Sequence, residues 1–251
     1  MLPALRLLAK NLSIVILPLT GMIAFYLLIF AALLTLIPAN ELINFAGNTE
    51  KIKEFVMANP VKTLAVFLLF GIIGFVLLEF FNAALIGSSI ELAMHGSYSL
   101  SSAFDYGFLY TPRLVALDLF CSLALVGFVM PLLIVYFISN SKIAYFLALI
   151  SAFLATPLVT MPRFVLVARD CGVFDAISEG FGFAIRNYAR IMATIAVATA
   201  ISLLSVFGLA ILAVPIANSL MSVWLSLIYV ENCKDVTSER GNKWIVFWHS
   251  R

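Results

Sequence analysis

Residues 191–230 read IMATIAVATAISLLSVFGLAILAVPIANSLMSVWLSLIYV and contain no charged side chain. A single helix of this length would extend about 60 Å, roughly twice the thickness of the hydrocarbon core of a bilayer. Gly208 and Pro215 lie near the middle of the segment, where the chain can reverse. We therefore expect two membrane crossings joined by a tight turn, a pattern typical of multi-pass membrane proteins.

The composition of the whole chain indicates the same class. Hydrophobic residues make up 63% of the sequence and charged residues 11%, whereas soluble domains contain about 45–50% apolar and about 25% charged residues. The net charge of +2 gives no basic face for nucleic acid. Cys121, Cys171, Cys233, His95 and His249 are scattered along the chain. Because metal ligands recur at fixed spacings, we expect no metal or cofactor.

Six stretches are long and apolar enough to cross a membrane. They are residues 12–37, 63–90, 114–138, 143–162 and the two halves of 191–230. The predicted fold is therefore all-α, a polytopic membrane helix bundle. Residues 1–232 form its six-helix transmembrane domain, and residues 233–251 form a tail whose tryptophans rest at headgroup level.

Amphipathic segments between the crossings predict short helices that lie at the membrane surface. The clearest are residues 97–112 and 173–186, which place apolar side chains at helical spacing, and residues 41–59 are a third. Arginine and lysine set the orientation, because cytoplasmic loops are enriched in them. With cytoplasmic termini, eleven cations face the cytoplasm and four the opposite side. We expect a multi-pass protein of the cell membrane with both termini cytoplasmic.

A short motif recurs in the sequence and suggests internal duplication. The pattern A-x3-G-F-x4-R occurs at Ala103–Arg113 and again at Ala176–Arg186. The segment Ala4-Leu5-Arg6 resembles Ala184-Ile185-Arg186, with Lys10 parallel to Arg190. These echoes predict three tandem helical hairpins that all start from the cytoplasmic side. Arg113, Arg186 and Arg190 would anchor the helix starts among the lipid headgroups.

Glu79 is the strongest candidate for a functional side chain, because it lies within the second crossing, where an ionised carboxylate is costly. Asn82 follows three residues later and shares its helix face. Two interpretations remain open. Glu79 either forms a proton or cation site at a cavity, or is a protonated carboxyl that hydrogen-bonds between helices. Asp118 lies one turn inside the third crossing, where we expect headgroup water to reach it and Arg113 to neutralise it.

The segment from Ala176-x3-Gly180-Phe181 through Arg186-Asn187, followed by apolar helices that end in Trp224-Leu225-Ser226-Leu227-Ile228-Tyr229, resembles a family of prokaryotic six-helix integral membrane proteins. That family is similar to the membrane domain fused to some glycerophosphoryl diester phosphodiesterases. The hydrolase domain is absent from this sequence, so no catalytic residue is carried over. The resemblance implies a stand-alone membrane domain without established chemistry.

Three functions remain in competition. The first is a non-enzymatic membrane protein that is a scaffold, a lipid-interacting module or the partner of another membrane protein or peripheral subunit. The second is a small secondary transporter, or a transporter subunit, that uses Glu79. The third is a membrane-embedded lipid enzyme, whose candidate residues are Asp105, Arg113, Asp175, Glu179 and Arg186. The sequence contains no P-loop, G-x-S-x-G or H-E-x-x-H motif, which favours the first function.

Overall fold

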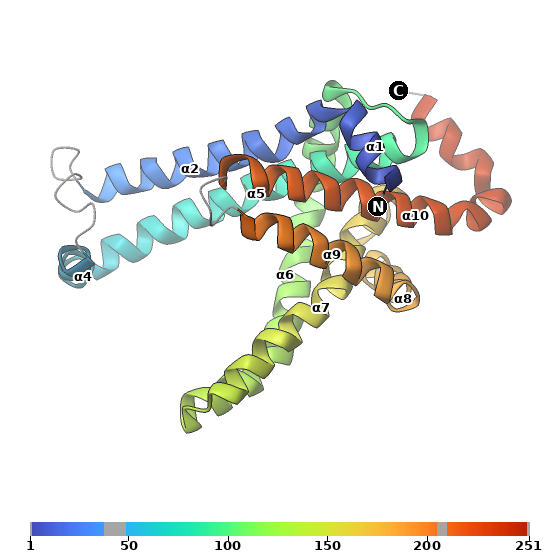
Figure 1. Cartoon of the computed structure of the whole chain (residues 1–251). Coiled ribbons are helices and arrows are strands. Elements are labelled where there is room, and N and C mark those ends of the chain that lie inside the picture. The colour runs from blue at the N-terminus through green and yellow to red at the C-terminus, as the bar shows by residue number, and fades with distance from the viewer. Residues whose placement is uncertain (1, 38–48, 205–209, 250–251) are drawn as a thin grey trace.

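The structure, a computed structural model, describes residues 2–37, 49–204 and 210–249, and the regular structure within these ranges is helical (Figure 1). The helices are α1 (Leu2–Lys10), η1 (Leu12–Val15), α2 (Ile16–Leu36), α4 (Thr49–Ala58), α5 (Pro60–His95), α6 (Leu100–Ser139), α7 (Lys142–Arg169), α8 (Val173–Arg186), α9 (Tyr188–Leu203) and α10 (Ala210–His249). The turn expected near Gly208 lies outside the described residues.

Five helical segments are long and apolar enough to cross a membrane, as a multi-pass membrane protein requires. They are Leu12–Leu36, Pro60–His95, Leu100–Ser139, Lys142–Arg169 and Leu212–Asn232. The remaining half of the 191–230 segment forms α9, a shorter apolar helix of 16 residues. The described part of the chain therefore contains five such spans and one shorter apolar helix, where the sequence predicts six crossings.

The predicted surface helices differ in whether they form separate helices in the structure. Residues 173–186 form the separate helix α8, and α4 falls within 41–59, of which residues 41–48 lie outside the described part. Residues 97–112 do not form a separate helix, because α6 runs without interruption from Leu100 through Pro112 to Ser139. The Thr111 hydroxyl donates to the Gly107 carbonyl beside this proline. Tyr110 and Leu114 are buried on either side of Pro112, so this part of the helix is enclosed by its neighbours.

The longest helices are divided into a buried part and an exposed part. Helix α5 has 36 residues and α6 has 40, so each is far longer than the hydrocarbon core of a bilayer. In α5, residues 83–90 are buried, whereas apolar residues such as Phe67 are exposed in its first half. In α6 the order is reversed: residues up to Cys121 include the buried ones, and Phe137 and Ile138 beyond are 78% and 82% exposed.

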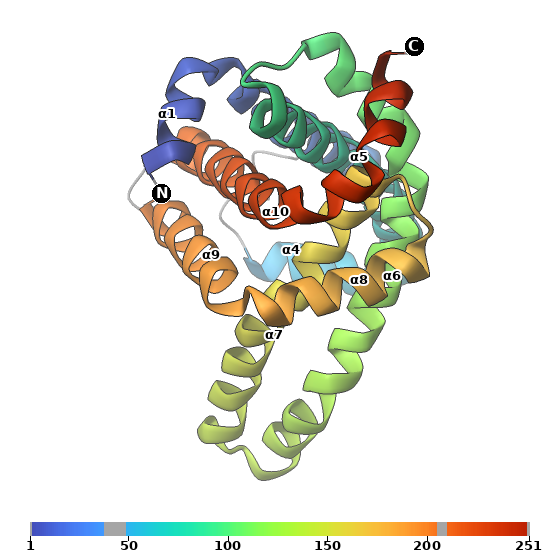
Figure 2. The same ribbon diagram turned by 90° about the vertical axis from the view of Figure 1, so that its right-hand side faces the viewer.

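The arrangement in space explains this division (Figure 1). Helix α2 packs along α5, α6 along α7, and α9 along α10. The α2–α5 pair and the α6–α7 pair diverge from a common base, where α1 and α8 also lie. At this base α10 packs against α1, α5 and α9 (Figure 2). The helix halves at the base form the core, and the diverging halves present apolar side chains outward.

Residues 233–249 continue α10 as helix, so the predicted tail is joined to the last crossing without a break in its helical backbone. Figure 1 shows that this last part turns away from the first part of α10. The side chains of the predicted headgroup tryptophans in this stretch lie outside the described residues.

Small residues permit close packing at the base. A Cβ atom on Gly107 would lie 2.6 Å from the Phe80 ring, and one on Gly180 would lie 2.6 Å from Cα of Pro162. Both glycines belong to the recurring motif, and the alanines of the two copies, Ala103 and Ala176, are fully buried. The motif residues therefore serve helix contact in both segments.

The two segments of the N-terminal echo end in similar ways. The Asn11 side chain donates to the Leu7 carbonyl at 3.1 Å where α1 ends, and the Asn187 side chain donates to the Phe183 carbonyl at 3.2 Å where α8 ends. An asparagine therefore ends each of the two helices, and the alignment of Arg6 with Arg186 stays a prediction.

The close approach of α7 and α8 gives a stability prediction. Gly180→Ala places a methyl group against the Pro162 backbone, which cannot move like a flexible side chain. We expect a loss of about 1–3 kcal/mol of stability. Gly182→Ala on the same helix is the matched control, since a Cβ there has nothing within 4 Å. Thermal unfolding in detergent measures both variants; equal unfolding temperatures for the two would show that the contact is not tight.

Candidate functional site

Four polar side chains from three helices meet where the helix pairs diverge. Glu79 and Asn82 come from α5, Asp118 from α6 and Arg163 from α7. We call these four residues the charge cluster. Glu79 and Asp118 are 4% and 2% exposed. Along both α5 and α6, the cluster lies at the boundary between the buried half and the exposed half of the helix.

Arg163 holds Asp118 through two contacts. Its Nε donates to Oδ1 at 2.8 Å, and its Nη2 lies 2.7 Å from Oδ2. The second contact is an ion pair, and Oδ2 itself is buried. The Asp118 side chain is 3% exposed and that of Arg163 is 28% exposed. A planar guanidinium that faces a buried carboxylate in this way compensates much of the cost of burying the charge.

Glu79 is the third charged member of the charge cluster. Its Oε1 accepts a hydrogen bond from the Asn82 amide at 3.2 Å, which agrees with the shared helix face expected from the sequence. The Glu79 carboxyl also interacts with both Asp118 and Arg163. Its Oε2 is buried and accepts no hydrogen bond from an N–H donor among the described residues, whereas the Asp118 carboxyl lies close enough to share a proton with it. Two carboxyls and one guanidinium form an electrically neutral group when the carboxyls together hold one proton.

The surroundings of Asp118 differ from those expected. Asp118 is buried in protein rather than reached by headgroup water, and its partner is Arg163 rather than Arg113. Arg113 instead forms an ion pair with Asp170 at the C-terminal end of α7, with 2.6 Å between Nη1 and Oδ1. The reason is geometric: five residues of helix direct the side chains of Arg113 and Asp118 to different sides of α6, whereas α7 packs alongside Asp118.

Sequence reasoning missed Arg163. The fourth crossing was expected to end at residue 162, so Arg163 counted only as a cytoplasmic cation. The structure continues α7 to Arg169. The signal was present in the sequence, because the apolar run Val165-Leu166-Val167-Ala168 after Arg163 indicates a further turn of buried helix. An arginine followed by such a run lies inside the helix and needs an internal partner.

The three expected anchors are all exposed at the base. Arg113 carries the ion pair with Asp170, and Arg190 lies in the first turn of α9. Arg186 ends α8 and lines a pocket. Of the residues considered for a lipid enzyme, only Glu179 and Arg186 line that pocket together. Within the described residues there is no group of three metal-ligating side chains of the His, Cys, Asp or Glu type.

Comparison of the chain with known protein families, with curated proteins and with solved structures found no match. The resemblance to the membrane domain of phosphodiesterase fusions therefore stays a prediction.

The charge cluster makes a prediction about stability. Arg163→Met leaves two carboxyls buried without their cation, so we expect a loss of about 3–5 kcal/mol, and the double variant Asp118→Leu/Arg163→Met should recover part of it. Arg113→Met is the control, because its pair with Asp170 has side chains that are 43% and 34% exposed and a pair of this kind contributes about 0–1 kcal/mol. Unfolding in detergent, followed by tryptophan fluorescence, compares the variants. Equal losses for Arg163→Met and Arg113→Met would contradict a buried role for Arg163.

Proposed function

We propose that this protein is a lipid-interacting scaffold of the cell membrane, with no catalytic chemistry of its own. Its six crossings form three tandem hairpins, and both termini are cytoplasmic. One observation carries the proposal: the buried charges of the described helices meet one another inside the protein, while long apolar faces remain exposed. Exposed apolar surface of this extent is solvated by lipid or covered by other membrane proteins.

The distribution of cations supports the orientation. Lys10, Arg113 and Arg190 lie at the base, whereas Lys62 and Lys142 begin helices at the far ends of the two diverging pairs. Both chain ends also lie at the base (Figure 1). The positive-inside rule then favours a base that faces the cytoplasm. The base is also where α8 presents the exposed apolar side chains of Phe174 and Ile185, as expected of a helix that lies at a membrane surface.

Cysteine labelling tests this placement in a variant whose native cysteines are replaced by alanine. We expect Lys142→Cys to react with a membrane-impermeant maleimide from outside intact cells. Arg190→Cys should react only after the membrane is permeabilised, and Phe128→Cys, which is 64% exposed on α6, should stay unlabelled because lipid covers it. Labelling of Phe128→Cys by the water-soluble reagent would show that the apolar faces are not in lipid, and the scaffold proposal would fail.

A second function, proton movement by a transporter or transporter subunit, is favoured by one specific feature of the charge cluster. The Glu79 and Asp118 carboxyls are both buried, and they interact with each other beside a single guanidinium. A proton held by these carboxyls can pass between them without leaving the helix junction. The cluster also lies where the two helix pairs diverge, so a change in its charge acts on the contact between them.

Proton flux into liposomes tests this second function. An imposed pH gradient should drive uptake, and Glu79→Gln should abolish it because glutamine cannot exchange the proton. Glu91→Gln is the matched control on the same helix, since Glu91 accepts a hydrogen bond from the Tyr106 hydroxyl at 3.4 Å and lies outside the cluster. A pH-sensitive dye inside the liposomes follows the flux. An unchanged rate and pH dependence in Glu79→Gln would rule out this route.

A further inference from the structure

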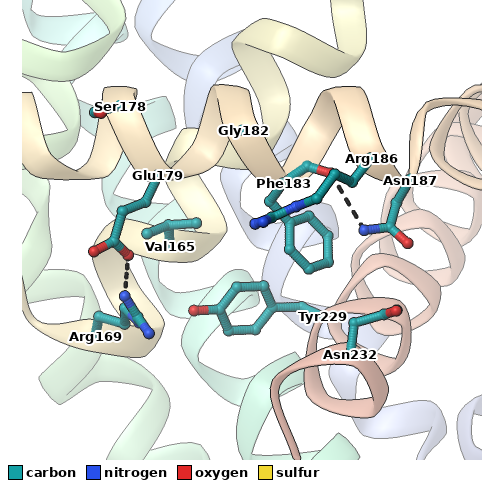
Figure 3. A pocket seen from close by; sticks show the side chains of 10 residues that line it. All are labelled: Val165, Arg169, Ser178, Glu179, Gly182, Phe183, Arg186, Asn187, Tyr229 and Asn232. Carbon is teal, nitrogen blue, oxygen red and sulfur yellow. Dashed lines mark hydrogen bonds and ion pairs between the residues drawn. The ribbon is translucent and has the colours of Figure 1, made fainter. Parts of the chain in front are cut away.

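A pocket of about 650 Å³ opens at the base between α7, α8 and α10 (Figure 3). Its volume is in the range of sites that bind small molecules. The wall contains Arg169 from α7, Glu179 and Arg186 from α8, and Asn232 from α10. The charge cluster contributes no side chain to this pocket, so the two sites are separate.

Arg186 gives the pocket its charge. It is exposed, and its guanidinium extends from α8 toward the interior of the pocket (Figure 3). Among the described residues it has neither an ion pair nor a hydrogen bond from its side chain. A guanidinium carries five N–H donors, and an oxyanion accepts two of them in matching bidentate geometry.

The other polar residues of the pocket wall provide hydrogen-bond donors and one carboxylate that competes with an anionic ligand for them. Arg169 forms an ion pair with Glu179 at one edge of the pocket. The amides of Asn187 and Asn232 each use one N–H on a backbone carbonyl of their own helix region, at 3.2 Å to Phe183 and 2.7 Å to Ile228. Each amide retains a second N–H. Two arginines and one glutamate leave a net charge of +1 in the pocket, which attracts an anion.

The apolar side chains of the wall indicate what kind of anion fits. Val165 and Phe183 are 1% and 6% exposed and form the inner face beneath the charged groups. Phe174 and Ile185 on α8 are exposed at 71% and 67% outside the pocket. A ligand with an anionic head and an apolar body therefore finds a charged surface in the pocket and an apolar surface on α8 outside it.

We propose that this pocket binds a phosphate group, carried either by the headgroup of an anionic lipid or by a free phosphate. Arg186 is its main ligand. Arg169 is the second, and it exchanges its contact with Glu179 for the phosphate. The lipid source rests on the proposed placement of the base at the membrane surface, whereas binding of free phosphate is independent of that placement.

Two binding measurements on the full-length protein in mild detergent test the site. Native mass spectrometry counts bound phosphatidylglycerol, with phosphatidylcholine as the lipid without net charge. The unfolding temperature is compared in inorganic phosphate and in chloride at equal ionic strength, and a higher value in phosphate indicates phosphate binding. We expect Arg186→Gln to weaken binding of whichever probe binds by at least about five-fold, because a charge-assisted hydrogen bond is lost. Arg190→Gln removes the same charge nearby, outside the pocket wall, and should change binding little.

Glu179→Gln gives the sharper result. Removal of the competing carboxylate should strengthen binding several-fold. Asp175→Asn is the matched control, because it changes the charge of the same helix equally and Asp175 does not line the pocket. Binding of the lipid alone assigns the headgroup, and binding of phosphate alone assigns the free anion. Either result supports the site when it depends on Arg186. The proposal is overturned if neither probe binds, or if the two arginine variants, or the two acid variants, behave alike.

Discussion

A hydrocarbon environment offers no hydrogen bonds, and this constraint governs how the polar groups of the protein are arranged. The hydroxyl side chains on exposed helix faces donate to carbonyls of their own helix: Thr20 to Ile16, Ser139 to Val135 and Ser151 to Leu147. Charged groups have no such local solution, because a helix carbonyl cannot neutralise a carboxylate. Asp118 and Glu79 therefore meet Arg163 across helix boundaries, and the packing of α5, α6 and α7 follows from that requirement.

The charge cluster and the small-residue contacts stabilise the base in different ways. Gly107 and Gly180 bring helix backbones close to Phe80 and Pro162, contacts that are strong at short range and insensitive to charge. The cluster instead acts at the one level where the helices begin to separate. Phe80 follows Glu79 in α5 and Pro162 precedes Arg163 in α7, so the glycine contacts lie beside the cluster, and a change in its protonation would act at the same level. The scaffold and transport functions thus use the same geometry and differ in whether the cluster changes state.

Length and lack of charge were enough to predict most of the long helices, since each apolar stretch has one favourable environment. Local spacing also predicted that Glu79 and Asn82 share a face. The Asp118–Arg163 pair was not predictable in the same way, because its members are 45 residues apart and only the register between α6 and α7 brings them together. The N-terminal part of the repeat stays a prediction, although its two segments end alike at Asn11 and Asn187.

The divergence of the α2–α5 and α6–α7 pairs has a consequence for the bilayer that surrounds them. If both pairs cross the same membrane, the protein has a wedge-shaped cross-section that widens away from the base. Acyl chains must then fill the space between the pairs, bounded by helices on two sides. The two leaflets receive unequal areas of protein, and such an imbalance imposes a bend on a thin elastic sheet.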